Sequence, residues 1–194
     1  MNKLSDTADL ILACTRKLIV GGGYNGFSYA DIAGVVGIRK PSIHHHFPTK
    51  VDLVTALLAR YRQEAEAGFE GLQSAIADPL DQLRAYIQYW STCLSDASAP
   101  FCVCALLASE LPALPGEVAL AVRAHFRFLS GQIASILERG LQQGVISLRY
   151  TVQVEAEAFM ATVHGAMLSA RAYGDAQMFV AIMQPQLERM SAKR

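Results

Sequence analysis

The sequence predicts an all-α protein, and three observations carry this prediction. Apolar residues recur at spacings of three and four along most of the 194 residues, which is the period of a helix with one buried face. Ala, Leu, Gln and Glu, which favour helices, are abundant. No sustained period-two alternation bounded by hairpin turns, the pattern typical of β-strands, is present.

The first expected helix runs from about residue 7 to 20, and the glycines 21–23 end it. Ser28 and Asp31 form an S-x-x-D variant of the capping box at the start of a short second helix. Gly37 is placed to end that helix in a left-handed conformation.

Pro41 opens a third helix, which runs to about Phe47, and Thr49 caps a longer helix from Lys50. Two short helices joined by a tight, glycine-containing turn form a helix-turn-helix pattern, in which the second helix enters the major groove of DNA. We therefore expect a three-helix DNA-binding domain over residues 1–50 and a larger helical domain over residues 51–194.

The larger domain contains six expected helices. They cover about residues 51–76, 78–95, 103–111, 116–143, 152–173 and 175–190. All seven prolines are expected near helix starts or in connections.

The charge distribution supports this division. The chain has 17 basic and 17 acidic residues and a formal net charge of zero. Residues 1–50 hold six basic and three acidic residues, so the head is net +3 and the remainder net −3. Residues 32–51 hold three cations, three histidines and no acid. A chain that is neutral overall thus carries a basic segment suited to phosphate contact.

Several other classes of protein are disfavoured. The longest stretches without Asp, Glu, Lys or Arg have 13 residues, whereas a membrane-spanning helix needs about 20 apolar residues. Acidic residues interrupt the apolar N-terminus, so it does not resemble a secretory signal, and we expect a cytoplasmic protein whose four cysteines are thiols.

The sequence also lacks the features of an enzyme or a metal protein. It contains no zinc-binding H-E-x-x-H motif, no phosphate loop and no nucleophile–base spacing, so we expect neither catalysis nor a cofactor. Consecutive helical residues lie 100° apart, so the side chains of residues 44–46, three histidines in a row, cannot converge on one metal ion.

The head resembles that of TetR-family transcriptional regulators. Segment 23–33, GYNGFSYADIA, resembles the family's GYxGTSxxDIA block, and segment 37–50, GIRKPSIHHHFPTK, resembles the GVSxGxLYxHFxSK block that follows it. Segment 11–14, ILAC, matches the opening helix, so the resemblance is contiguous over about 45 residues. Three positions differ: Arg39 replaces a usual Ser or Thr, His44 a usual Tyr, and Val51 a usual acidic residue.

The resemblance implies the roles of the head's polar residues. It implies that Lys50, at a helix N-terminus, holds a DNA phosphate with backbone amides. It implies backbone contacts for Ser28, Tyr29, Thr49 and His44, and base-edge contacts for Lys40, Ser42 and His45. Arg39 adds a cation that suits phosphate.

The expected helix over residues 152–173 indicates a dimer. It is apolar nearly all round from residue 158 to 170, so it must be buried on both sides, and its small residues permit close helix approach. With the last helix it fits a dimeric four-helix interface, the alternative being a core helix of a monomer. The candidate interface residues are Ala158, Ala161, Thr162, Gly165, Ala166, Ser169, Phe179 and Ile182.

Aromatic and sulfur-containing residues in the middle of the chain suggest a small-molecule pocket. The spacing of residues 86, 89, 90 and 93 places them on one helix face. Such a stripe also occurs in plain hydrophobic cores, but the family resemblance favours a pocket. The candidate ligand-binding residues are Tyr61, Tyr86, Tyr89, Trp90, Cys93, Cys102, His125 and Phe126.

Segment 101–111, FCVCALLASEL, resembles the GCLxxNLAxEL segment of the TetR subgroup that includes N-ethylmaleimide-sensing and acrylate-sensing repressors. Cys102 falls on the subgroup's cysteine, while Phe101 and Leu106 replace its usual Gly and Asn. Cys102 lies near an expected helix start, where the helix dipole lowers a thiol pKa, so it is the candidate electrophile or redox sensor.

If Cys102 and Cys104 share a helix they lie about 200° apart, which leaves Cys93 as the better partner for Cys102 if a functional pair exists. The alternative is that all four cysteines are small buried hydrophobic residues. Cys14, in the opening helix, is expected to be structural.

These observations predict a homodimeric TetR-like repressor. Its apo form is expected to bind a palindromic operator through residues 28–50, and a small-molecule ligand or thiol-reactive electrophile to release it. One alternative is a reversible sensor of an aromatic or acyl ligand with passive cysteines. Another is an all-α enzyme or small-molecule carrier without DNA binding.

Overall fold

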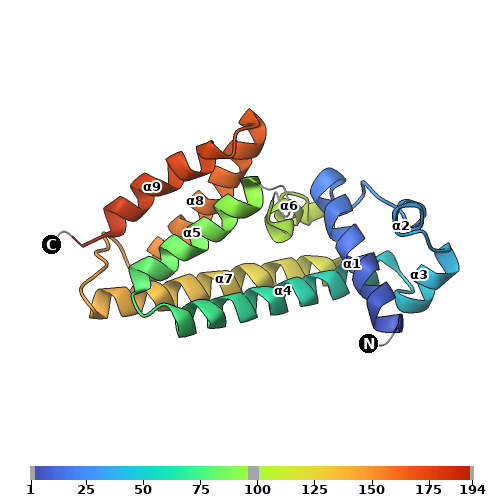
Figure 1. The fold of residues 1–194 in the computed structure, drawn as a ribbon, viewed down its shortest axis with the longest axis horizontal. Coiled ribbons are helices and arrows are strands. Elements are labelled where there is room, and N and C mark those ends of the chain that lie inside the picture. The colour runs from blue at the N-terminus through green and yellow to red at the C-terminus, as the bar shows by residue number, and fades with distance from the viewer. Residues whose placement is uncertain (1–2, 96–100, 193–194) are drawn as a thin grey trace. The chain divides into compact units, whose positions relative to one another are not determined.

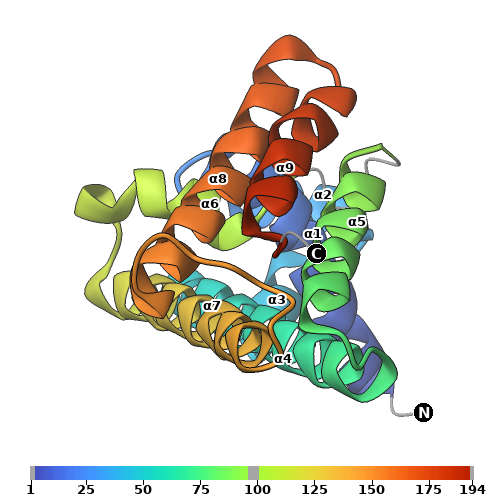
Figure 2. The same cartoon turned by 90° about the vertical axis from the view of Figure 1, so that its left-hand side faces the viewer.

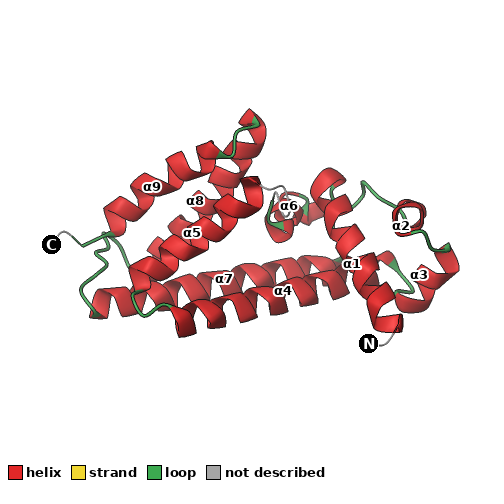
Figure 3. Ribbon diagram, in the orientation of Figure 1, coloured by secondary structure: helices red, strands yellow, loops and turns green. Residues whose placement is uncertain are grey.

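The computed structural model describes residues 3–95 and 101–192, which are helical almost throughout (Figure 3). The helices are α1 (Lys3–Gly22), α2 (Tyr29–Val36), α3 (Lys40–His46), α4 (Lys50–Ala75), α5 (Pro79–Ser95), α6 (Val103–Ser109), α7 (Gly116–Gln142), α8 (Val152–Tyr173) and α9 (Gln177–Met190). A 3-10 turn, η1 (Leu111–Ala113), follows α6. Within the described residues the only β pairing is a single bridge between Ile146 and Ser191. The predicted all-α fold is confirmed.

The chain forms two compact units, one of residues 1–64 and 102–125 and the other of residues 65–101 and 126–194. Helices α4 and α7 each contribute residues to both units.

In the first unit, α1, α2 and α3 pack together as a three-helix head (Figure 1). Its core consists of apolar side chains from all three helices: Ile11, Ile19, Ile32 and Ile43 are fully buried, and Phe47 is 8% exposed. Burial of these side chains holds the two short helices, which are too short to be stable alone.

Local signals set the boundaries of the short helices. The Ser28 hydroxyl accepts a hydrogen bond from the Ala30 amide, and the Asp31 carboxylate accepts one from the Ser28 amide at 2.7 Å, so the predicted capping box is present. Gly37 ends α2 with φ +75°, a left-handed conformation as predicted. Thr49 and Asp52 make the same reciprocal bonds at the start of α4.

In the second unit, α5, α8 and α9 contact one another (Figure 2). Phe159 of α8 and Phe179 and Met183 of α9 are fully buried in its core. Helix α8 begins and ends at the residues predicted from the sequence. Thr151 caps its first turn, and Gly174 adopts φ +64° after its last.

Some boundaries differ from the sequence prediction. Helix α1 continues through Gly21 and Gly22, and the left-handed residue that follows it is Gly23. The expectation that all prolines lie at helix starts or in connections is wrong for Pro185, which lies inside α9. Pro185 is on the exposed side of this helix, so its ring does not disturb the core. None of the described helices is long and apolar enough to cross a membrane.

Candidate functional site

Helix α3 presents most of the candidate DNA-binding side chains. Its apolar residue Ile43 is buried against the head. Arg39, Lys40, His44 and His45 are exposed and Ser42 is half-buried. Arg39 makes no side-chain cap for α3, which agrees with the loss of the usual Ser or Thr. The structure thus brings these five residues to one short helix whose polar side is accessible.

The other predicted contact residues use their polar groups within the head. The Ser28 hydroxyl donates to Asp31 and the Thr49 hydroxyl donates to Asp52, both at 2.7 Å. The Tyr29 hydroxyl donates to the carbonyl of Phe47 at 2.8 Å, and burial raises the pKa of Tyr29 to about 12, so this phenol stays neutral. These side chains therefore fix the ends of α2, α3 and α4.

Lys50 connects the start of α4 to the segment between α1 and α2. Its Nζ donates to the carbonyl of Phe27 at 2.5 Å and lies 4.0 Å from the Phe27 ring centre and 5.0 Å from that of Tyr24. Burial lowers the pKa of Lys50, and the Asp31 charge opposes this shift. One of its three N–H donors is thereby used inside the protein.

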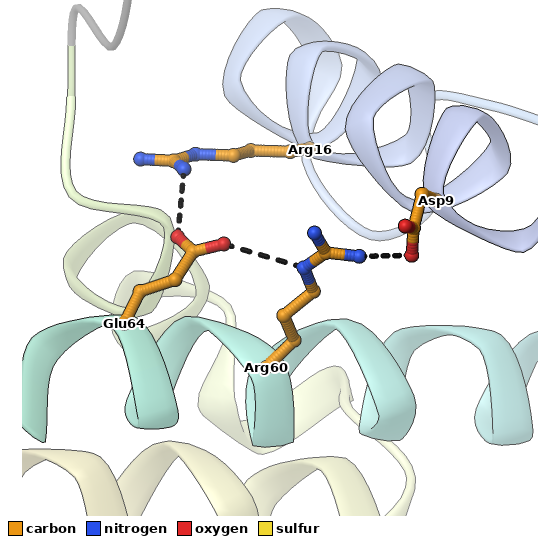
Figure 4. A network of polar contacts seen from close by, with 4 residues as sticks. All are labelled: Asp9, Arg16, Arg60 and Glu64. Carbon is orange, nitrogen blue, oxygen red and sulfur yellow. Dashed lines mark hydrogen bonds and ion pairs between the residues drawn. The ribbon is translucent and has the colours of Figure 1, made fainter. Parts of the chain in front are cut away.

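A chain of ion pairs joins α1 to α4 within the first unit (Figure 4). Arg60 bonds to Asp9 and to Glu64, the latter at 3.4 Å, and Glu64 also bonds to Arg16 at 3.3 Å. These side chains are 25–51% exposed, so each pair contributes at most about 1 kcal/mol. The network connects α1 to α4 at the protein surface.

A contact that the sequence did not predict joins α6 to the turn after α1. Glu110, which follows α6, accepts a hydrogen bond from the Tyr24 amide at 2.9 Å. The same carboxylate lies over Gly23, where a Cβ atom would be 1.8 Å from Glu110 Oε1. The two partners are 86 positions apart in the sequence, which explains why no local pattern pointed to the contact. Gly23 is required both for its φ of +75° and for this close approach.

Three predicted ligand-binding residues come together in the first unit. The Tyr61 ring lies 5.1 Å from that of His125, and Tyr61 is hydrogen-bonded to Cys102. The guanidinium of Arg16 also lies over the Tyr61 ring, 4.8 Å from the ring centre. All three predicted residues are nearly inaccessible, with exposures of 7% for Tyr61, 2% for His125 and 1% for Cys102.

The predicted lowering of the Cys102 pKa is wrong. Burial raises the pKa of this thiol, and it outweighs the hydrogen bonds from Tyr61 and from the backbone at the start of α6, which lower it. Burial likewise raises the pKa of Cys104. All four cysteines are buried thiols, which agrees with the predicted absence of disulfides in the described residues.

The other predicted ligand-binding residues lie in the second unit. Tyr86, Trp90 and Cys93 are buried on one face of α5, but Tyr89 is 54% exposed, so the common face does not place it with the other three. Tyr86 stacks on Phe69 with 5.4 Å between ring centres. The indole N–H of Trp90 is buried without a hydrogen-bond partner within the described residues. Phe126 lies 5.2 Å from the His164 ring and lines an open pocket of about 250 Å³ between α7 and α8.

Comparison with known proteins identifies the fold family. Residues 11–57 match the family model described as bacterial regulatory proteins, tetR family, and residues 79–184 match the model for the tetracyclin repressor-like C-terminal domain. The second match alone covers more than half of the chain. The chain belongs to the TetR family of transcriptional regulators. Members of this family are regulators rather than enzymes, so the prediction that the chain is not an enzyme is confirmed.

Individual TetR-family proteins resemble the chain to different degrees. A TetR-family regulator from Agrobacterium tumefaciens is 62% identical, with 98% of this chain and 100% of that chain covered and a TM-score of 0.96. The reduced form of NemR from E. coli is 20% identical with a TM-score of 0.84, over 96% of this chain and 98% of NemR, which shows the same fold.

The regulator CymR from Pseudomonas putida is 35% identical over 51 residues, which cover 26% of this chain and 25% of CymR. The chain therefore matches only about a quarter of the length of that relative.

The TetR fold leaves one apolar face of α8 uncovered within the protomer. Val154, Ala158, Ala161, Gly165 and Leu168 follow one another at spacings of four and three and are all exposed, Leu168 by 59%. We call these five residues the α8 seam.

The predicted interface residues divide into two groups. Ala158, Ala161 and Gly165 are exposed, and Thr162, Ser169 and Ile182 are partly exposed. Ala166 and Phe179 are 1% and 0% exposed, because α8 and α9 pack against each other through them. The prediction is therefore wrong for these two residues, which belong to the core of the protomer.

Proposed function

We propose that this TetR-family protein is a homodimeric repressor that binds a palindromic operator through residues 28–50. The observation that carries the proposal is α3, whose exposed side holds Arg39, Lys40 and two imidazoles without an acidic residue. Donors of this kind suit the phosphates and base edges of a major groove, where TetR-type helix-turn-helix motifs bind.

The two kinds of DNA contact are assigned to different residues. Arg39 and Lys50 contact phosphate, and Lys40, Ser42 and His45 face base edges. Ser28, Tyr29, His44 and Thr49 contact the DNA backbone, and the internal bonds of Ser28, Tyr29 and Thr49 also hold the amides at the starts of α2 and α4 in place.

The first experiment is a fluorescence-anisotropy titration with fragments from upstream of the protein's own gene and from neighbouring intergenic DNA. Sequence-specific binding is expected, and Lys40→Ala is expected to weaken it by about tenfold or more at fixed salt. Failure of every fragment to bind specifically refutes the repressor proposal. Lys17→Ala, which removes an exposed cation of α1, is the matched control for a general loss of charge.

The α8 seam is proposed to face its own copy in the dimer. Its residues are small or apolar and evenly spaced, and neighbouring α9 adds the partly exposed Ile182, which together suits close packing of two helix pairs. Ala161→Glu is expected to produce monomers in analytical ultracentrifugation. Ala67→Glu, which places the same charge at an exposed alanine of α4, is expected to leave dimers. A dimeric Ala161→Glu protein contradicts the seam.

A small-molecule ligand that binds the larger domain is proposed to release the operator. The burial of Cys102, at 1% exposed with a raised pKa, supports a reversible ligand and passive cysteines. A thiol-reactive inducer is the second candidate, because Tyr61 and the backbone at the start of α6 provide hydrogen bonds to the Cys102 sulfur.

The two candidates are distinguished by operator release with a thiol-reactive electrophile in the wild type and in Cys102→Ser. Equal release in both proteins eliminates Cys102 as the sensor. Release from the wild type alone supports the electrophile, and Cys14→Ser serves as the control for a buried thiol elsewhere in the first unit.

A further inference from the structure

His44 is held in one orientation on the exposed side of α3. Its Nδ1 lies 3.1 Å from the carbonyl oxygen of Pro48, and its ring centre lies 4.6 Å from that of Tyr29 with the planes 51° apart. Tyr29 is in turn held by its hydrogen bond to the Phe47 carbonyl. The imidazole is thus fixed on two sides while the residue remains exposed.

The bond to Pro48 determines which nitrogen of His44 carries the proton. A carbonyl oxygen only accepts hydrogen bonds, so Nδ1 must be the donor. The neutral ring then has its single N–H on Nδ1, and Nε2 offers only a lone pair. A DNA phosphate also offers only acceptors, so neutral His44 cannot donate a hydrogen bond to phosphate while it keeps its bond to Pro48. The protonated ring keeps that bond and gains a donor and a positive charge at Nε2.

The charged and titratable groups around His44 lie on α3 itself and on α1, α2 and α4. No carboxylate bonds to the imidazole among the residues that the structure describes. On α2, Tyr29 is neutral and Asp31 is bonded to Ser28; on α4, Asp52 is bonded to Thr49 and Lys50 to Phe27. The other charged residues and histidines with described side chains are Arg39 before α3, Lys40, His45 and His46 on α3, and Asp9, Arg16 and Lys17 on α1, of which Asp9 and Arg16 pair with α4.

We propose that each operator-binding head takes up one proton at His44 when it contacts DNA phosphate, so that operator affinity rises as the pH falls. Imidazole is the side chain whose charge changes between pH 5 and 8, and a phosphate contact favours its protonated form. The inference rests on the proposed function, in which α3 faces DNA. It adds that this contact senses pH.

The test is the operator affinity of the full-length protein between pH 6 and 8 at constant ionic strength. If binding takes up one proton, operator affinity falls by up to about tenfold for each unit by which the pH rises. A dimer with two heads takes up two protons, so its affinity falls by up to about a hundredfold for each pH unit. His44→Gln removes the titrating group, and His44→Tyr replaces it with a donor that stays neutral in this range. Both variants are expected to lose most of the pH dependence.

His45→Gln is the matched control, because it removes a neighbouring exposed imidazole for which the described residues provide no carbonyl bond that selects a tautomer. It is expected to retain the part of the pH dependence that His44→Gln removes. Circular dichroism at each pH verifies that the variants are folded, which is expected because the His44 side chain is exposed.

The outcomes separate the inference from the function on which it rests. Absence of specific binding at every pH refutes both. Specific binding with the same pH dependence in the wild type and His44→Gln refutes the proton uptake alone. Affinity that rises with pH also refutes it, because it means that binding releases protons and does not take them up. Long-range ¹H–¹⁵N spectra of the free protein provide a second check: the Nδ1–H tautomer is expected, and an Nε2–H tautomer contradicts the inference.

Discussion

The contact between Glu110 and the turn after α1 is predicted to respond to mutation in a non-additive way. Gly23→Ala forces an alanine into a left-handed conformation, which costs about 1 kcal/mol. Its Cβ would lie 1.8 Å from Glu110 Oε1, so the carboxylate must move away and release the Tyr24 amide, which it binds at 2.9 Å. Loss of a hydrogen bond to a charged group costs about 2 kcal/mol, which gives about 3 kcal/mol for Gly23→Ala.

Glu110→Ala removes the same hydrogen bond and is expected to cost about 2 kcal/mol. In the double variant the bond is lost only once, so the expected cost is about 3 kcal/mol and not the sum of about 5 kcal/mol. The free energy of unfolding of the four proteins, measured in urea at one protein concentration, gives the coupling directly. In a chain of this size Gly23→Ala is expected to lower Tm by roughly 6–12 °C.

The control is Gly37→Ala, which has the same φ of +75° but no atom within 4 Å of the added Cβ. It is expected to cost about 1 kcal/mol and to add independently to Glu110→Ala. Additive costs for Gly23→Ala and Glu110→Ala would refute the reasoning, since they would mean that the two changes disturb different interactions.

Three further predictions concern a cap, a half-buried histidine and a buried thiol. Ser28→Ala removes the side-chain half of the α2 capping box and is expected to destabilise the protein by about 1 kcal/mol in urea unfolding, whereas Ser28→Thr keeps a hydroxyl that accepts from the Ala30 amide and donates to Asp31; an unchanged midpoint for the alanine variant would contradict the role of the cap. Burial lowers the pKa of His164 to about 4, below its value in the unfolded chain, so the unfolded state binds more protons between about pH 6.5 and 4 and stability is expected to fall as the pH falls through this range. His164→Gln should flatten this part of the pH profile, and an equally steep profile would show that another group is responsible. Tyr61→Phe removes a hydrogen bond that lowers the pKa of Cys102, so alkylation of Cys102 is expected to be slower than in the wild type. Mass spectrometry locates the alkylated residue, and faster alkylation of Cys102 would contradict this prediction.

The features that the sequence predicted well are those specified by neighbouring residues. The capping box of Ser28 and Asp31 needs only residues three apart, and Gly37 needs only its own backbone conformation. The range of α8 follows from Thr151 at one end and Gly174 at the other. These signals act within one helix turn, so they can be identified from the sequence before the tertiary structure is known.

The features that the sequence predicted poorly depend on packing between distant segments. The position of Cys102 at a helix start favours a lowered thiol pKa, but side chains from other parts of the chain bury Cys102 and raise its pKa. Ala166 and Phe179 have the size and spacing of interface residues, yet the packing of α8 on α9 buries them. An apolar helix face does not by itself reveal whether its own chain or a second copy covers it.

The internal bonds of the head reduce the number of its basic residues that are free to contact DNA. The six basic residues behind its net charge of +3 include Arg16, which pairs with Glu64, and Lys50, which donates to the Phe27 carbonyl. Among the described side chains, the exposed cations of the head are then Lys17 on α1 and Arg39 and Lys40 at the start of α3.

Among the described side chains, each head has three permanent cations at or next to α3, namely Arg39, Lys40 and Lys50, so phosphate neutralisation is limited. Counterion release changes the salt dependence by about 0.9 logarithmic units for each phosphate contact, so six such cations in a dimer give a slope of at most roughly −5. Protonation of His44 adds one cation to the three of each head and raises the number of positive charges beside α3 by a third. In a head with so few permanent charges, one titrating imidazole therefore has a large effect on operator affinity, whereas in a strongly basic head the same proton would change little.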